Sequence, residues 1–162
     1  MPETDILQSL DTEKADPRSK FLDTLTPLEF ATLMNTFDRE ASDAVAMALP
    51  SVAEAIKAIF ARIETGGRLF YIGAGTSGRL GVLDASECPP TFGVSAELVQ
   101  GIIAGGDRAL RFAIEGAEDD PDAAKADLAS HGFSAKDALV AISASGYAPY
   151  CIGGLRYARS LG

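Results

Sequence analysis

The sequence predicts an α/β fold with a doubly wound, mainly parallel sheet, preceded by an amino-terminal helical arm. Three short runs predict the strands: Leu69–Ile72, Leu98–Ala104 and Ala138–Ile142. Each is apolar on both faces, as strands buried in a parallel sheet are. Helical patterns separate the runs, and only helical periodicity precedes them. Alternation of this kind is typical of a sheet with helices on both faces.

We divide the chain into two parts. Residues 1–66 form an extended arm and helices that we expect to serve dimerisation or packing, and residues 67–162 form the first part of the α/β domain. Three strands leave a doubly wound sheet with an unpaired edge, so we expect the sheet to be incomplete in this chain.

Capping signals define the helices of the first part. Thr26, Pro27 and Glu29 make a capping box with a first-turn proline, which predicts a helix start. Pro50 is expected to end a second helix, and a third begins just after it and ends at Gly66–Gly67.

Helices are also expected between the strands. The helix after the first strand should end at the double proline Pro89–Pro90, and two others should cover Arg108–Glu115 and the segment from Asp120 to Gly132. A further helix is expected from Pro149 onward.

Composition narrows the class of protein. The chain has 162 residues, 47% of them hydrophobic, and a net charge of −9, which argues against general affinity for nucleic acid or anionic membranes. No export leader and no apolar stretch of membrane-spanning length stand out, so we expect a cytoplasmic protein. Cys88 and Cys151 lack zinc-site spacing and are expected to be reduced thiols.

A glycine-rich turn follows the first strand. The sequence Gly73-Ala74-Gly75-Thr76-Ser77-Gly78 fits the dinucleotide fingerprint, but no acidic residue closes the second strand to hold a ribose. Thr76 and Ser77 instead place two hydroxyls at a helix amino terminus, which suits a phosphomonoester. The alternative is a tight strand-to-helix turn without a ligand.

A second hydroxyl cluster, Ser143-Ala144-Ser145-Gly146, follows the third strand. The ends of parallel strands open on the same side of a sheet, so both clusters can converge on one phosphate. Taken alone, the second cluster is a capped loop about as often as a site.

Several carboxylates are candidates for acid–base chemistry: Asp84, Glu87 and the run Glu115–Asp120. Composition alone does not choose among them, and Glu118 alone is typical of a surface acid near a helix start. The one histidine, His131, is expected at a helix end, which supports neither a histidine-based triad nor a zinc site. Carboxylates, hydroxyls and backbone donors are therefore the groups that remain as candidates for the chemistry of the site.

The unbroken stretch from Gly73 to Gly93 resembles the signature of N-acetylmuramic acid 6-phosphate etherases, and so do Glu115–Asp119 and Ile152–Arg159. The resemblance covers nearly the whole chain. It implies a sugar-isomerase-type (SIS) domain that binds a phosphosugar, usually as a homodimer with its active site near the subunit interface. The implied reaction is ether cleavage without metal or organic cofactor, giving N-acetylglucosamine 6-phosphate and D-lactate in peptidoglycan recycling.

The resemblance also implies roles for individual residues. Glu87 matches the family's acid, which protonates the departing lactate oxygen and later activates water, and Glu118 matches the base that removes the C2 proton. The residues that match the phosphate cradle are Gly75, Thr76, Ser77, Gly78, Ser143, Ser145 and Gly146.

The chain departs from the family pattern in two ways. Tyr147-Ala148 stands where the family often has arginine and threonine, and family members are roughly twice this length. The alternatives are a non-catalytic phosphosugar-binding module, an inactive fragment, and a related phosphosugar isomerase, which the long signature disfavours. A dinucleotide-binding domain is the least favoured.

Overall fold

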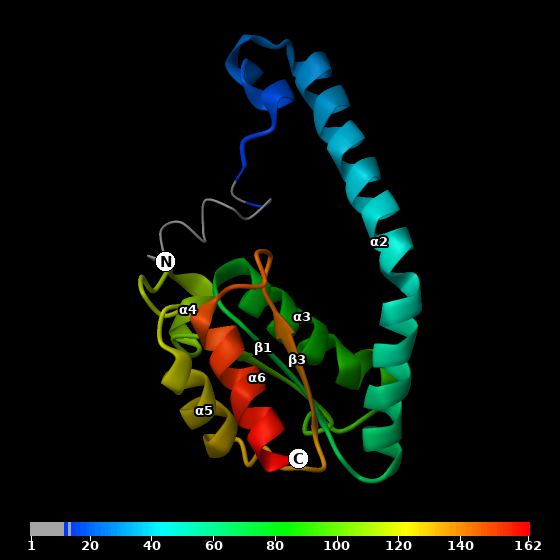
Figure 1. Cartoon of the computed structure of the whole chain (residues 1–162), viewed down its shortest axis with the longest axis vertical. Coiled ribbons are helices and arrows are strands. Elements are labelled where there is room, and N and C mark those ends of the chain that lie inside the picture. Colours follow the sequence, from blue (N-terminus) through cyan, green and yellow to red (C-terminus); the bar gives the residue numbers. More distant parts are fainter. Residues whose placement is uncertain (1–11, 13) are drawn as a thin grey trace. The chain divides into compact units, whose positions relative to one another are not determined.

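The computed structural model describes residues 12 and 14–162 (Figure 1). The described residues up to Ala58 form one compact unit, and Ile59–Gly162 form another. In the first unit, two short 3-10 helices, η2 (Pro17–Ser19) and η3 (Leu22–Thr24), stand where we expected an extended arm. The rest of that predicted arm, before residue 14, lies largely outside the described residues. Arg18 joins η2 to the long helix through an ion pair with Glu40 at 2.6 Å.

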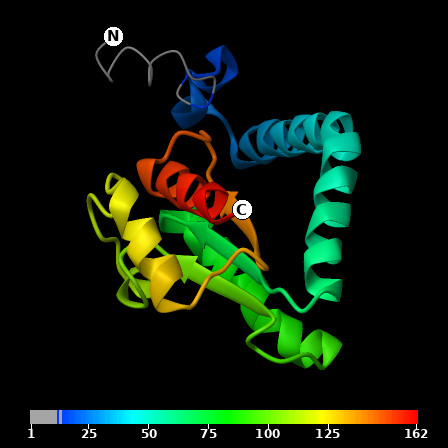
Figure 2. The ribbon, with the colours of Figure 1, turned by 60° about the horizontal axis from the view of Figure 1, so that its bottom comes forward.

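The long helix α2 spans Pro27–Glu64. Its predicted start is confirmed, because the Thr26 N–H donates to Glu29 Oε2 at 2.8 Å in a capping box. The predicted division into separate helices is wrong, since Pro50 lies inside one continuous helix. Alanine and other strong helix formers on both sides of Pro50 outweigh its lost hydrogen bond. The helix bends partway along its length (Figure 2), as proline-containing helices do.

α2 is also long and apolar enough, by length and composition alone, to cross a membrane. The expectation that no apolar stretch reaches such a length was therefore wrong. None of its residues is buried. A single helix of this kind is weak evidence for a span, because apolar helices that pack against protein pass the same test.

The second unit contains a parallel sheet of three strands in the order β2-β1-β3, which confirms the predicted fold class. The strands are β1 (Leu69–Gly73), β2 (Val99–Ile103) and β3 (Ala138–Ile142), all within the predicted runs or a residue of them. β3 lies at an edge of the sheet and its residues are only partly buried. The sheet is therefore open on that side, as the sequence predicted.

Helices cover the two faces of this sheet (Figure 1). On one face, α3 (Gly75–Phe92) packs against β1 and β2, and Gly101 allows the close approach because a Cβ there would collide with the Val82 backbone. On the other face lie α5 (Pro121–Ser130) and α6 (Pro149–Leu161). The core beneath α5 and α6 consists of Phe70, Ile72, Ile102, Ala104, Ala124, Leu128, Phe133, Tyr150 and Cys151.

Two predicted helix ends were wrong. α3 continues through Pro89 and Pro90 to Phe92, because Gly93 supplies the left-handed cap (φ 66°) whose N–H donates to the Pro89 carbonyl. α4 covers only Arg108–Arg111, since Phe112 is extended. The Asp120 cap of α5 is confirmed: its Oδ1 accepts from the N–H groups of the next turn.

A closed polar network ties the amino ends of β1 and β3 together. The Arg68 Nη2 lies 3.0 Å from Asp137 Oδ2, and the Ser134 N–H donates to the same oxygen at 2.9 Å. Burial alone would raise the pKa of Asp137, but hydrogen bonds from Arg68 and Ser134 outweigh it and hold that pKa below its ordinary value. The Asp137 side chain is only 3% exposed.

Candidate functional site

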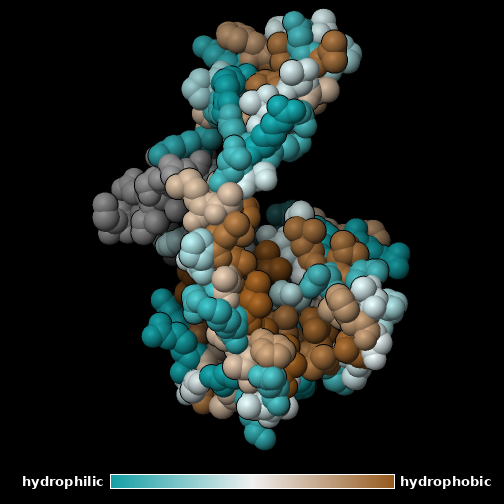
Figure 3. Space-filling view, turned by 90° about the vertical axis from the view of Figure 1, so that its right-hand side faces the viewer, coloured by the Kyte–Doolittle hydropathy of each residue, from teal (hydrophilic) through white to brown (hydrophobic). Residues whose placement is uncertain are grey.

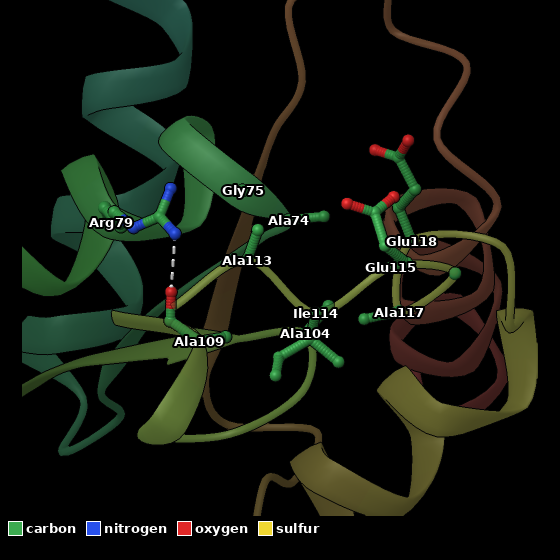
Figure 4. A pocket seen from close by; sticks show the side chains of 11 residues that line it. Ala74, Gly75, Arg79, Ala104, Ala109, Ala113, Ile114, Glu115, Ala117 and Glu118 are labelled. Atoms are coloured by element: carbon green, nitrogen blue, oxygen red, sulfur yellow. Dashed lines mark hydrogen bonds between the residues drawn. The ribbon is translucent and has the colours of Figure 1, made fainter. Parts of the chain in front are cut away.

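A cavity of about 160 Å³ opens at the carboxyl end of the sheet (Figure 4). The chain passes from β1 to β2 on one side and then crosses back over β1 to reach β3 on the other, so the strand order reverses beside β1, and open α/β folds bind ligands in the crevice at such a point, here between β1 and β3. The cavity lies on the β2 side of β1, next to this crevice, because its lining comes from the segments that follow β1 and β2 and not from the segment that follows β3. It is lined by Ala74, Gly75, Arg79, Ala104, Ala109, Ala113, Ile114, Glu115, Gly116, Ala117 and Glu118.

The glycine-rich turn forms one wall of the cavity. Gly75 adopts φ 53°, and a Cβ on Gly78 would collide with the Gly73 carbonyl, so α3 starts directly against the end of β1. The first hydrogen bond of α3 is donated by Gly78 to the Ala74 carbonyl at 3.2 Å. The N–H groups of Thr76 and Ser77 therefore have no helical acceptor and can face an anion.

The second hydroxyl turn lies next to the first. β1 and β3 pair in parallel with Gly73 opposite Ile142, so the residues that follow each strand emerge side by side. Ser143 Oγ accepts from the Gly146 N–H at 3.1 Å, and Ser145 Oγ accepts from the Tyr147 N–H at 3.2 Å. Both hydroxyls are acceptors within their own loop and keep a proton to donate.

Glu118 lines the cavity from the loop between α4 and α5, and α6 holds this loop. The backbone N–H of Tyr150, in the first turn of α6, donates to the Glu118 carbonyl at 2.9 Å. The Tyr150 ring is fully buried and its hydroxyl donates to Asp127 at 2.7 Å. Gly153 packs so closely on the carbonyl of Pro121 that no side chain fits there.

The Glu118 side chain itself is exposed, and its charge acts on Cys151 of α6. Burial raises the pKa of the Cys151 thiol, and the negative charge of Glu118 raises it further. Cys151 is a free, buried thiol, and Cys88 is also free, as the sequence predicted. Glu118 is therefore fixed through its backbone while its carboxylate remains open to a ligand.

Sequence reasoning missed Arg79, whose guanidinium lines the cavity opposite the carboxylates (Figure 4). Its Nε donates to the Leu110 carbonyl at 3.1 Å and its Nη2 to the Ala109 carbonyl at 2.7 Å. The available signal was spacing: Arg79 follows Gly75 by four residues and so lies on the same face of α3.

Glu87 lies outside this cavity. It is exposed on α3, twelve residues after Gly75, which corresponds to roughly 18 Å along a helix. Leu80 and Leu83, which precede it on the same helical face, are 55% and 57% exposed. Large apolar side chains thus reach solvent on this helix, and Figure 3 shows hydrophobic patches on one face of the molecule.

The structure thus brings two of the predicted site residues, Gly75 and Glu118, to one cavity. The hydroxyl residues lie at the same edge of the sheet without lining that cavity. The predicted residues outside the lining are Thr76, Ser77, Gly78, Glu87, Ser143, Ser145 and Gly146.

A known protein family matches most of this chain. Residues 51–159 match the family described as the glucokinase regulatory protein N-terminal SIS domain. The match covers the sheet, both hydroxyl turns and the cavity. This chain belongs to the SIS-domain family. The resemblance noted in the sequence is borne out at the level of the SIS domain.

Curated relatives of this SIS domain are N-acetylmuramic acid 6-phosphate etherases. Those of Glaesserella parasuis and Histophilus somni are both 54% identical to it, over 100% and 93% of this chain and 54% and 50% of their own lengths. The relative from Clostridium beijerinckii is 53% identical over 96% of this chain and 51% of its own. The chain spans about half the length of the curated relatives it matches.

Proposed function

We propose that this chain is the amino-terminal part of an N-acetylmuramic acid 6-phosphate etherase, a carbon–oxygen lyase of peptidoglycan recycling. The observation that carries the proposal is the presence of Glu118 and the glycine-rich turn at one cavity, beside the crevice of a doubly wound sheet. The identity of about half to the curated etherases supports it. The site then serves a phosphosugar in the cytoplasm, without nucleic acid or membrane as a partner.

The proposed phosphate site is the pair of hydroxyl turns. The 6-phosphate accepts hydrogen bonds from the Thr76 and Ser77 N–H groups at the start of α3 and from their hydroxyls. The Ser143 and Ser145 hydroxyls, one strand away, supply further donors. Neutral donors and a helix dipole bind a dianion without the basic surface that this acidic chain lacks.

In the proposed reaction Glu118 is the base. Its carboxylate removes the proton from C2 of the sugar, and the C3–O bond to lactate breaks as the C2–C3 double bond forms. The departing lactate oxygen takes a proton from the acid, Glu87. Water then adds at C3, assisted by the same acid acting as base, and C2 regains a proton, so that N-acetylglucosamine 6-phosphate and D-lactate result.

The proposed acid needs a route into the cavity, because Glu87 lies far along α3 in its own chain. We place it in the cavity of a second copy, in a homodimer that also covers the exposed Leu80 and Leu83. Apolar side chains of this size on one helix face are typical of a protein interface. In this arrangement each of the two sites uses Glu118 of one chain and Glu87 of the other.

The first experiment measures D-lactate release from N-acetylmuramic acid 6-phosphate by the purified chain. Glu118→Gln and Glu87→Gln should each slow release by roughly 10²- to 10⁴-fold, the usual contribution of a positioned acid or base. The matched control is Glu97→Gln, an exposed glutamate outside the site, which should stay within about twofold of the parent. Equal rates in Glu118→Gln and the parent would remove Glu118 from the mechanism.

Isotope incorporation tests the elimination directly. Product formed in D₂O should carry deuterium at C2, because the proton removed from C2 is replaced from solvent. Direct displacement of lactate at C3 would leave the C2 proton in place and contradict the proposed role of Glu118.

Mixing the two inactive variants tests the shared site. A heterodimer of Glu87→Gln and Glu118→Gln would contain one intact site, so an equal mixture after subunit exchange should recover about a quarter of the parent activity. No recovery, with heterodimers demonstrated by native mass spectrometry, would place both glutamates of a site in one chain.

A second candidate function is a non-catalytic phosphosugar-binding module. The observation that favours it is the match to a domain family described by a regulatory protein. Binding of the phosphosugar without any lactate release by the folded chain would support this candidate over the etherase.

A further inference from the structure

We infer that Arg79 recognises the carboxylate of the lactyl group and thereby determines the specificity of the site. The inference rests on the proposed etherase function. It starts from the guanidinium of Arg79, which lines the same cavity as Glu118. Among the described residues that line this cavity, Arg79 is the only cation, and it faces two carboxylates, Glu115 and Glu118 (Figure 4).

The guanidinium of Arg79 is held in place by hydrogen bonds, but only some of its N–H donors take part in them. Its Nε and Nη2 donate to the Leu110 and Ala109 carbonyls at the carboxyl end of α4, which locks the plane of the group. A guanidinium has five N–H donors, so these two bonds leave three, both on Nη1 and the second on Nη2. No ion pair joins Arg79 to either glutamate within the described part of the chain. The charge is therefore held in place but not neutralised.

The cavity needs such a charge. Glu115 and Glu118 alone would repel an anionic sugar, and a fixed guanidinium offsets them. A guanidinium also matches the planar geometry of a carboxylate, to which it can donate two parallel hydrogen bonds. A planar carboxylate is thus the natural ligand for the free edge of Arg79.

The position of Arg79 assigns it to the lactyl group rather than to the 6-phosphate. The hydroxyl residues proposed for the phosphate do not line the cavity, whereas Glu118 does. Glu118 acts at C2, and C3, the next carbon, carries the lactyl ether. The lactyl carboxylate is thus the anionic group nearest to the carbon on which Glu118 acts, and the phosphate is at the far end of the sugar.

The test compares two ligands that differ in this carboxylate. Isothermal titration calorimetry in a Glu118→Gln background, which prevents turnover, measures binding of N-acetylmuramic acid 6-phosphate and of 3-O-methyl-N-acetylglucosamine 6-phosphate. Adding Arg79→Gln should weaken the first by roughly 10- to 100-fold, the range of a lost charge-assisted contact. The second, which lacks the carboxylate, should change by less than about twofold.

Arg111→Gln is the matched control, because Arg111 is an exposed arginine of α4 outside the cavity lining, and it should leave both affinities unchanged. Arg79 also anchors α4, so a loosened fold must be distinguished from a lost contact. A loosened fold would lower the affinity for both ligands together. The inference would be overturned by an equal loss of affinity for the two ligands, and also by no loss of affinity for either. If the background chain binds neither ligand, the proposed function fails and the inference with it.

Discussion

The polar side chains at the two ends of the sheet differ in how they are paired. At the amino end, Arg68, Asp137 and Ser134 form a network in which each charged group has its partner, and Asp137 is almost fully buried. At the carboxyl end, Arg79 and Glu118 share a cavity without an ion pair and remain open to a ligand. The comparison teaches that polar groups near one small core can be committed to stability at one edge and left available for chemistry at the other.

The largest effect on stability is expected from breaking the polar network at the amino end of the sheet. Asp137→Asn removes the partner of a partly buried arginine, and we expect the free energy of unfolding to fall by about 3 kcal/mol. Affinity for N-acetylmuramic acid 6-phosphate should stay within about twofold, because the proposed ligand site lies at the opposite end of the sheet. Urea denaturation and calorimetry measure the two quantities.

The control is Glu54→Gln, which breaks the exposed ion pair with Lys57 and should cost about 0.5 kcal/mol or less. The pH dependence identifies the charge. The folded pKa of Asp137 is lowered, so its stabilisation is complete above the unfolded pKa of about 3.9 and is lost as the pH falls through the folded value. The gap between parent and Asp137→Asn should therefore shrink at strongly acid pH, and a constant gap would contradict this account.

A smaller effect on stability is expected at the carboxyl end of the sheet, from a change in α6, the helix that supports the loop with Glu118. Gly153→Ala places a methyl group against the rigid backbone carbonyl of Pro121, and we expect a loss of about 2 kcal/mol in unfolding free energy. D-lactate release should also fall by about tenfold, since the loop that carries Glu118 must shift.

Gly154→Ala, one residue along α6, is the matched comparison. The added methyl there meets the flexible end of the Ile72 side chain instead of backbone, so the loss should be smaller. Equal losses in stability for the two variants would show that the contact with Pro121 does not hold the loop.

The smallest effect on stability is expected from a change at Tyr150, which distinguishes the role of its hydroxyl from the role of its backbone N–H. Tyr150→Phe removes the hydrogen bond to Asp127 and should cost about 1 kcal/mol in unfolding free energy. The N–H that holds the Glu118 carbonyl is retained, so the rate of lactate release should be unchanged. A slower rate in a folded Tyr150→Phe variant would mean that the hydroxyl also positions Glu118.

Short sequence patterns predicted the strands and two of the helix starts, because these features depend on residues that are close together in the chain. The apolar runs identified all three strands, and the caps at Thr26 and Asp120 identified two helix starts. Proline rules failed at Pro50 and at Pro89–Pro90, because helix formers on both sides of Pro50 and the Gly93 cap compensate for the lost hydrogen bonds.

The site was predictable only in part. The glycine-rich turn and the serine turn have sequence signatures, and parallel pairing of β1 with β3 brings them together. Arg79 was missed because its partners, the carbonyls of Ala109 and Leu110, are about thirty residues away and leave no pattern in side-chain types. The support of Glu118 by Tyr150 is likewise a backbone contact, which any residue at position 118 and any residue other than proline at position 150 could make.

That backbone contact has a consequence for redesign. Since the Glu118 position is fixed by its carbonyl oxygen, the side chain can be exchanged without releasing the loop. Aspartate, histidine or cysteine introduced there would present a different proton acceptor from the same anchored position. Residue 118 is thus a site at which the chemistry of the cavity can be varied while its architecture is held constant.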